Sequence, residues 1–380
     1  MPNPNAFVAA VTRIEQLPSE RVTAEGLRTE AGGLSVEFEK ERAARLDPQD
    51  RRSAGFGRVL EVLRRSALPA YVEVNDEGVI TRLLVPILAK VAAIMEDANA
   101  VSVELEVSHA RHVLSRSNPD FDELLGALRA ARDKGETVAV TEIEGHEIID
   151  VRPYRRPFEP PLREPPREWL RVLYWPLTLL HWLYCIIFCC GRCVSAHRAQ
   201  ELFDLAAAQT CDPLAVPPPC IPFLYPDDGC WGRAHEMCRL MIAAGAAPRK
   251  VWIYSTPPAH LHADTRNNPQ CFVNWGWHVA PTLCVSVGRR FPFLFCRVQE
   301  QVIDPSLFTT PVSEATWKGV QGDPAAQLVP TDASIFYRSS GGSTQTDPTY
   351  AQTAQVLDTY RAQLLLRSTQ VGPPPYANCP

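Results

Sequence analysis

Cysteine is absent from the first 184 residues of this 380-residue chain, and all 12 cysteines lie at or after Cys185. Charged residues are sparse in the cysteine-containing region: residues 169–380 hold only 15 of the 38 basic and 14 of the 43 acidic residues. A joint change in charge and sulfur content predicts a domain boundary. The chain also lacks a strong excess of either sign, with a formal net charge of −5, and this gives no reason to expect a nucleic-acid partner.

A secretory signal is also not predicted. The stretch "MPNPNAFVAAVTRIEQ" has neither a basic cluster nor a continuous apolar run. We therefore expect a cytoplasmic or membrane-associated protein, with export by a non-classical route as the alternative.

The cysteine-free part is predicted to consist of two units. Residues 1–54 are polar and charge-rich and predict a partly flexible polar arm. Residues 55–152 combine helical periodicity with hairpin patterns and predict a small α+β domain of unknown role. Its histidines His109, His112 and His146 are expected to be ordinary solvated or capping side chains, and not a site.

A proline-rich linker and a hydrophobic segment follow. Residues 153–168 contain six prolines and predict a stiff, extended spacer. Residues 169–193 form a hydrophobic, cysteine-rich segment, within which the 19 residues 172–190 carry no formal charge and are long enough to cross a membrane. Pro176 and His181 favour the other reading, a helix buried against the next domain. The spacing of the cysteines in this segment does not match a standard zinc site, and no metal is predicted.

Residues 194–380 predict a larger α+β domain, in which a helix that carries a cysteine precedes an antiparallel sheet. Cys220, Cys271, Cys284 and Cys379 are expected to form disulfides if the protein is exported and to be buried thiols if it is not.

Cys230 is the candidate nucleophile. In "YPDDGCWGRAHEMCRLM", residues 225–241, a turn leads through Gly229 into a predicted helix that begins near Cys230. Free amides at a helix start favour a thiolate and can face a developing oxyanion. The glycines beside Cys230 leave room for a substrate, whereas Arg233, Glu236 and Arg239 are expected on the solvated face of the helix.

A base and an acid follow from the predicted strands. His278 begins a strand, and pairing residues 274–287 with 293–305 so that Val287 faces Phe295 places His278 opposite Asp304. Cross-strand neighbours lie close enough for a carboxylate to orient an imidazole. Cys230, His278 and Asp304 therefore predict a catalytic triad. Gly229, Trp231, Trp275 and Trp277 are candidate substrate-binding residues.

Four motifs, in order, carry a family resemblance: "YPDDGCWGRAHEMCRLM", "KVWIY", "WGWHVAPTL" and "VIDPSLFTTPVS". Together they resemble the protein-glutaminase family over residues 200–340. The resemblance implies a papain- and transglutaminase-like fold and a Cys-His-Asp triad that falls on Cys230, His278 and Asp304. Members of that family have an inhibitory pro-region, but the first 150 residues here resemble none that we can identify.

The predicted function is hydrolysis of glutamine side chains in proteins or peptides to glutamate, with release of ammonia through a Cys-thioester and without a cofactor. Two alternatives remain. One is a cysteine protease or transglutaminase-like acyl transferase, which shares the acyl-enzyme. The other is a membrane-tethered interaction module with a vestigial triad.

Overall fold

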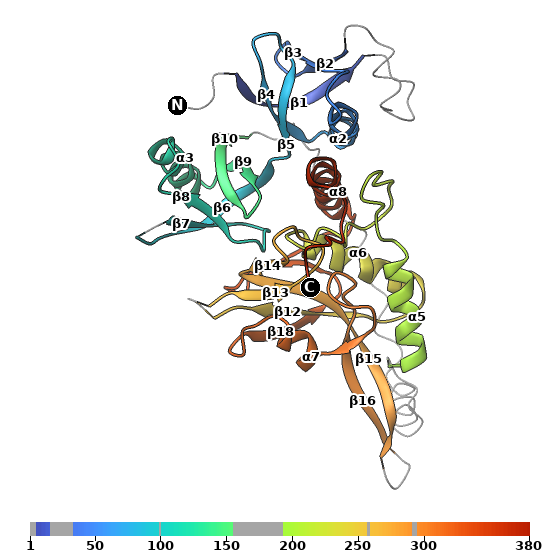
Figure 1. Ribbon diagram of the computed structural model, residues 1–380. Coiled ribbons are helices and arrows are strands. Elements are labelled where there is room, and N and C mark those ends of the chain that lie inside the picture. The colour runs from blue at the N-terminus through green and yellow to red at the C-terminus, as the bar shows by residue number, and fades with distance from the viewer. Residues whose placement is uncertain (1–4, 16–32, 99, 155–192, 257–258, 291–294) are drawn as a thin grey trace, which may run out of the picture.

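The computed structural model describes residues 5–15, 33–98, 100–154, 193–256, 259–290 and 295–380. The hydrophobic stretch 172–190 and almost all of the linker lie outside these residues. Within the described ranges, no helix combines the length and apolarity that a membrane span requires. The chain has a mixed α+β fold with several separate sheets (Figure 1).

The amino-terminal residues form a sheet, and the predicted polar arm is wrong for the part that is described. Five antiparallel strands pair in the order β3-β2-β1-β4-β5. Their bounds are β1 Ala6–Ile14, β2 Leu34–Phe38, β3 Arg42–Leu46, β4 Pro69–Val74 and β5 Ile80–Leu84. Leu34, Val36 and Phe38 of β2 are buried while Ser35 and Glu37 between them are not, so this strand of period two contributes one apolar face. Helix α2 (Ser53–Arg65) packs its buried side chains against this sheet.

A second unit is a small closed barrel. Its strands pair in the order β10-β8-β7-β6-β9, and α3 (Phe121–Lys134) packs on it. The bounds are β6 Ile87–Glu96, β7 Ala100–Leu105, β8 His112–Ser115, β9 Thr137–Ile143 and β10 Glu147–Pro153. The predicted single domain over 55–152 is therefore wrong, because β4 pairs with β1, β5 pairs with β4, and the division falls between β5 and β6.

The carboxy-terminal part is built on a sheet of order β17-β16-β15-β12-β18, with β11 also paired to β15. The bounds of its strands are β11 Val194–Ser195, β12 Arg249–Tyr254, β15 Trp277–Arg290, β16 Phe295–Val302, β17 Val312–Ser313 and β18 Gln327–Asp332. Two small hairpins pair β13 (Leu261–Asp264) with β14 (Phe272–Trp275) and β19 (Ile335–Arg338) with β20 (Thr344–Thr346). The helices are α5 Ala196–Ala207, α6 Cys230–Ala243, α7 Glu314–Gly319 and α8 Ala351–Val371.

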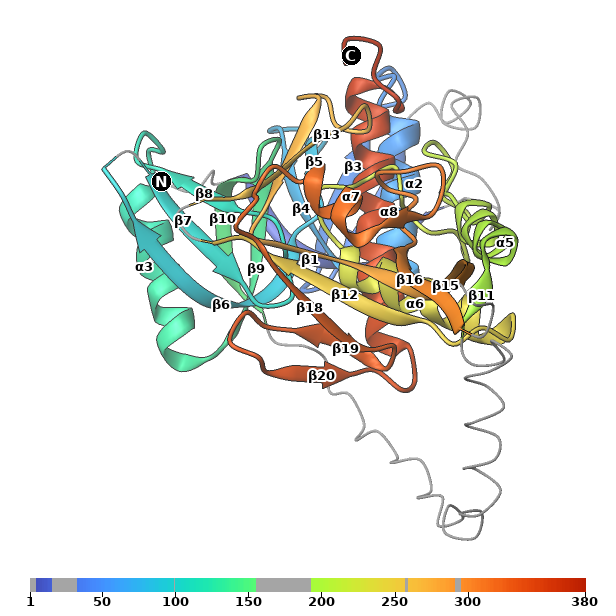
Figure 2. The same cartoon turned by 90° about the horizontal axis from the view of Figure 1, so that it is seen from below.

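Helix α8 joins the amino-terminal sheet to the carboxy-terminal part. It contacts α2 on one side and α6 on another, and Figures 1 and 2 show it lying between them. One continuous apolar core contains Phe56 and Leu60 of α2, Leu365 of α8 and Trp231 of α6. The two parts are therefore held together by buried apolar surface, which is the main favourable contribution to folding.

Three disulfides connect described residues: Cys193–Cys284, Cys211–Cys220 and Cys271–Cys379. They contain all four cysteines that the sequence offered as disulfide partners. The bond of Cys193 also excludes it as a metal ligand. Structural disulfides are typical of proteins that work in oxidising compartments.

The α2–α8 contact depends on the absence of a side chain at Gly55, which predicts a stability effect. A Cβ atom at Gly55 would lie 2.1 Å from Cγ2 and 2.8 Å from Cβ of Thr369 on α8, so one helix has to move. We expect Gly55→Ala to lower the free energy of unfolding by about 1–3 kcal/mol, as overpacking does, in urea denaturation.

Gly126→Ala on α3 is the matched control, because a Cβ atom there would meet no neighbouring residue within 4 Å. We expect this variant to be neutral, or more stable by up to about 1 kcal/mol, through helix propensity alone. Equal effects at the two glycines would contradict close packing of α2 on α8.

Candidate active site

Cys230 is the first residue of α6, as the sequence predicted, and its position depends on Gly229. Gly229 is the N-cap with a φ of 81°, a conformation that favours glycine. A Cβ atom there would lie 2.3 Å from Cδ2 of Tyr360, so the close approach of α8 also requires glycine. The helix start therefore directs its free amides towards the region of the thiol.

His278 and Asp304 are in contact. His278 Nε2 lies 2.9 Å from Asp304 Oδ2, and Trp317 Nε1 donates to the same carboxylate oxygen at 2.9 Å. This contact was predicted, but the strand register assumed for the pairing of residues 274–287 with 293–305 is wrong. Arg290, and not Val287, faces Phe295, and a bulge lies between Ser286 and Gly288. Asp304 follows the end of β16, two residues beyond the Thr282–Val302 pair. It therefore meets His278 as a diagonal neighbour.

The thiol and the imidazole converge. One donor atom of Cys230 and one of His278 lie within 4.8 Å of each other, and both side chains are buried. Because Nε2 of His278 is engaged with Asp304, its Nδ1 is the atom left for a proton exchange, and Nδ1 has no hydrogen-bond partner among the described residues. A thiol, an imidazole and a carboxylate thus stand in the order that nucleophilic catalysis requires.

The electrostatics of this site differ from the expectation for Cys230. Burial raises the pKa of the Cys230 thiol well above its ordinary value, and nearby Arg233 only partly opposes this. Burial therefore disfavours the thiolate, despite the place of Cys230 at a helix start. Burial likewise lowers the pKa of His278 against the opposing effect of Asp304. Burial is the largest single effect on the pKa of Asp304 and raises it, but the hydrogen bond and charge of His278, the hydrogen bond from Trp317 and the charge of Arg233 together make the net shift downward.

A segment of the barrel covers the thiol and explains this burial. Residues 108–110 lie between β7 and β8 and pair with the carboxy-terminal part. Gly276 N donates to His109 O at 2.9 Å, and Ala110 forms an antiparallel bridge with Trp275. Ser108 Oγ and His109 N both donate to Asp228, at 2.6 and 3.0 Å. We call residues 108–110 the inserted segment.

The ring of His109 fills the space beside the thiol. It is enclosed by Trp231, Trp275 and Trp277, with ring centroids 6.2, 5.3 and 5.5 Å away. Three of the four candidate substrate-binding residues thus contact the inserted segment. The expectation that His109 and His112 are solvated is wrong, since both are buried, and His146 is largely buried. The burial of His109 has no local signal, because its aromatic neighbours are more than 100 residues away in the chain.

Two residues of the site were missed by sequence reasoning. Asp228 is fully buried and also accepts a hydrogen bond of 2.5 Å from the hydroxyl of Tyr360. Arg233 is buried and donates to the carbonyl oxygens of Tyr225 and Asp228, so its predicted place on a solvated face is wrong. Glu236 of the same face is buried as well. A buried arginine beside a free thiol is a signal that only the fold reveals.

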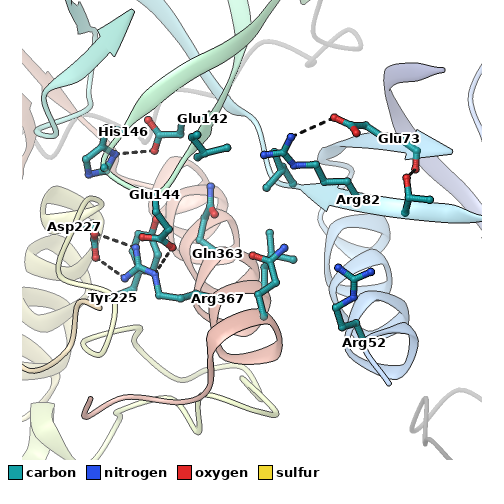
Figure 3. A pocket seen from close by; sticks show the side chains of 16 residues that line it. Arg52, Glu73, Arg82, Glu142, Glu144, His146, Tyr225, Asp227, Gln363 and Arg367 are labelled. Atoms are coloured by element: carbon teal, nitrogen blue, oxygen red, sulfur yellow. Dashed lines mark hydrogen bonds and ion pairs between the residues drawn. The ribbon is translucent and has the colours of Figure 1, made fainter. Parts of the chain in front are cut away.

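A cavity of about 590 Å³ lies where the barrel, the amino-terminal sheet and α8 meet (Figure 3). Its charged side chains are paired: His146 with Glu142, Arg82 with Glu73, and Arg367 with Asp227 and Glu144. Cys230, His278 and Asp304 do not line it. The cavity therefore belongs to the junction between the barrel and the carboxy-terminal part, and not to the candidate active site.

Comparison with known proteins agrees with this geometry. A protein-family model described as Glutaminase matches residues 199–321, a range that contains Cys230, His278 and Asp304. The resemblance to protein glutaminases is thereby confirmed for this part of the chain. No curated protein sequence matches the chain.

Solved structures of protein glutaminases are similar at a distance. The crystal structure of pro-protein-glutaminase is 20% identical and covers 78% of this chain and 99% of its own, with a TM-score of 0.47. The NMR structure of protein-glutaminase from Chryseobacterium proteolyticum is 24% identical and covers 50% of this chain and 97% of its own, with a TM-score of 0.36.

The His146–Glu142 pair predicts a pH-dependent stability. Burial alone lowers the pKa of His146, but the charge and hydrogen bond of Glu142, with Asp227 and Asp228 further off, raise it to about 9. An unfolded histidine has a pKa of about 6.5. The pair therefore stabilises the fold fully below about pH 6.5, and this contribution is lost as the pH rises towards 9.

We expect His146→Gln to lower the free energy of unfolding by about 1–3 kcal/mol at pH 6 and by little at pH 9.5. Urea titrations of both proteins at the two pH values measure this difference. A deficit that is the same at both values would show that the charge of His146 contributes nothing.

Proposed function

We propose that the chain is a hydrolase that deamidates glutamine side chains of proteins or peptides. The contact between His278 and Asp304, made beside a free thiol at a helix start, supports this proposal most directly. The family match over the same residues supports glutamine as the substrate. The packing of α6 on β15 of an antiparallel sheet is consistent with a papain- or transglutaminase-like arrangement.

In the proposed reaction, Cys230 is the nucleophile. Its proton passes to Nδ1 of His278, and the thiolate attacks the carbon of the side-chain amide. The C–N bond breaks, His278 protonates the departing ammonia, and a thioester remains. His278 then takes a proton from water, the hydroxide attacks the thioester, and glutamate is released with the thiol restored.

The other residues have supporting roles in this mechanism. Asp304 orients His278 and stabilises its protonated form. Amides at the start of α6 stabilise the oxyanion. Trp231, Trp275 and Trp277, which enclose His109, would enclose the substrate side chain once the inserted segment withdraws. The described form is therefore closed, and the reactive form requires displacement of residues 108–110.

Ammonia release tests the proposal. Because the ring of His109 fills the space beside the thiol, we use the full chain and its His109→Ala variant with an unfolded, glutamine-rich protein as substrate. We expect His109→Ala to release ammonia faster than the parent chain. Adding Cys230→Ala should abolish release, and adding Asp304→Asn should reduce it by two to four orders of magnitude, as loss of a triad carboxylate does.

The same samples distinguish the alternatives. A protease would leave shorter substrate fragments on a gel, and an acyl transferase would leave crosslinked species. His197→Ala is the control, because its side chain is 85% exposed and lies outside the site. Ammonia release that persists in the Cys230→Ala background would contradict the proposal. The absence of release from every variant would favour the alternative of a non-enzymatic interaction module.

A further inference from the structure

Three donor atoms converge under the inserted segment. One atom each from His109, Cys230 and His278 lies within 4.8 Å of the other two, and all three residues are 1% exposed. The proposed catalysis uses Cys230 and His278, but it has no use for His109. The presence of this imidazole in the site therefore needs its own explanation.

The nitrogens in this cluster lack the partners that buried polar atoms normally have. Both ring nitrogens of His109 and Nδ1 of His278 are buried, and none of them makes a well-formed hydrogen bond within the described residues, although the backbone of Trp277 lies near the His109 ring. Asp228 Oδ1 lies 3.3 Å from His109 Nε2, but not in hydrogen-bond geometry. Buried polar groups in native proteins are nearly all satisfied. One nitrogen from each imidazole, together with the free thiol, can therefore share a single partner.

The ring orientations suit such a partner. Both imidazoles lie nearly parallel to the indole of Trp275, at interplanar angles of 12° and 18°. Their centroids are 5.5 Å apart, which is too close for rings on opposite faces of one indole. They therefore lie side by side on one face of Trp275, where the in-plane lone pairs of both rings can be directed at a single point.

Each imidazole also has a carboxylate beside it. Asp304 is hydrogen-bonded to Nε2 of His278, and Asp228 stands 3.3 Å from Nε2 of His109. A histidine that ligates a metal commonly presents its other ring nitrogen to a carboxylate, which orients the ring and strengthens it as a donor.

A second cluster, His112, Glu142 and His146, has a similar composition but different bonding. Both nitrogens of His112 are engaged, by Ser108 and Glu142, and Nδ1 of His146 is bonded to Glu142. Its atoms satisfy one another, so this cluster does not call for an ion.

We propose that His109, Cys230 and His278 form a zinc site that holds the inserted segment over the nucleophile. One thiolate and two imidazoles are donors that Zn²⁺ prefers, and three protein ligands with a fourth position for water complete a tetrahedral site. The thiol gives up its proton to solvent when the zinc–sulfur bond forms. The site deepens the proposed function, because it would regulate the same thiol, yet the binding of zinc itself requires no activity.

Cobalt(II) serves as the spectroscopic probe for the zinc site. The full-length chain is treated with a chelator, without thiol reductant, and titrated with Co²⁺. We expect one equivalent to bind with a thiolate-to-cobalt absorption band in the near ultraviolet, and excess Zn²⁺ to remove the band. Cys230→Ala should lose the band. His109→Gln, which retains side-chain volume, should weaken binding at least tenfold, because even outer partners of metal ligands contribute 10- to 100-fold.

Two further measurements keep the result interpretable. Zn²⁺ should raise the melting temperature of the parent chain and slow alkylation of Cys230, and both effects should be lost in His109→Gln. His146→Gln, in the second cluster, is the matched control and should bind Co²⁺ as the parent does. Circular dichroism confirms that each variant is folded.

Three outcomes would overturn the zinc site: no thiolate band in the parent chain, equal affinity in parent and His109→Gln, or loss of binding in His146→Gln alone. These outcomes are independent of the catalytic proposal. A cobalt band without ammonia release would support the zinc site and contradict the proposed enzyme activity. Ammonia release that depends on Cys230, without a cobalt band, would support the enzyme activity and contradict the zinc site.

Discussion

One buried carboxylate connects the two halves of this protein. Asp228 accepts hydrogen bonds from Ser108 and His109 of the barrel, from Tyr360 of α8 and from the backbone of Gly229 at the start of α6. A fully buried carboxylate is costly unless it is hydrogen-bonded. Each of these donors is therefore held in place, and with them the position of the barrel, of α8 and of the candidate nucleophile.

The arrangement that positions the Cys230 thiol also blocks access to it. Burial under the inserted segment raises the pKa of Cys230 and lowers that of His278. The described form thus holds the parts of a nucleophilic site where burial disfavours both the thiolate and the imidazolium. Withdrawal of the segment would return water to both groups and remove the largest cause of both shifts. Substrate access to Cys230 and formation of its thiolate are therefore coupled, because both depend on whether the inserted segment excludes water.

Local signals identified the parts of the site in the carboxy-terminal domain. The Gly229–Cys230 helix start was predictable, because a turn followed by an amphipathic pattern is a strong local signal. The contact between His278 and Asp304 was predicted as well, although the register was off by two residues. Strand registers depend on bulges and turn geometry, and the bulge beyond Ser286 leaves no clear mark in the sequence. The amino-terminal arm was misjudged because β2 and β3 have only five residues each and carry polar side chains between their buried ones.

The sequence by itself determined the chemistry available to this protein: a cysteine at a helix start, a histidine in a strand, an aspartate at a strand end, and the glutaminase-like motifs around them. Only the tertiary structure decided what surrounds that chemistry. The placement of His109 against Cys230, the hydrogen bonds from Ser108 and Tyr360 to Asp228, and the disulfides Cys193–Cys284 and Cys271–Cys379 all join residues far apart in the chain. Such contacts depend on how whole sheets and helices pack, and no local pattern of residues encodes that packing.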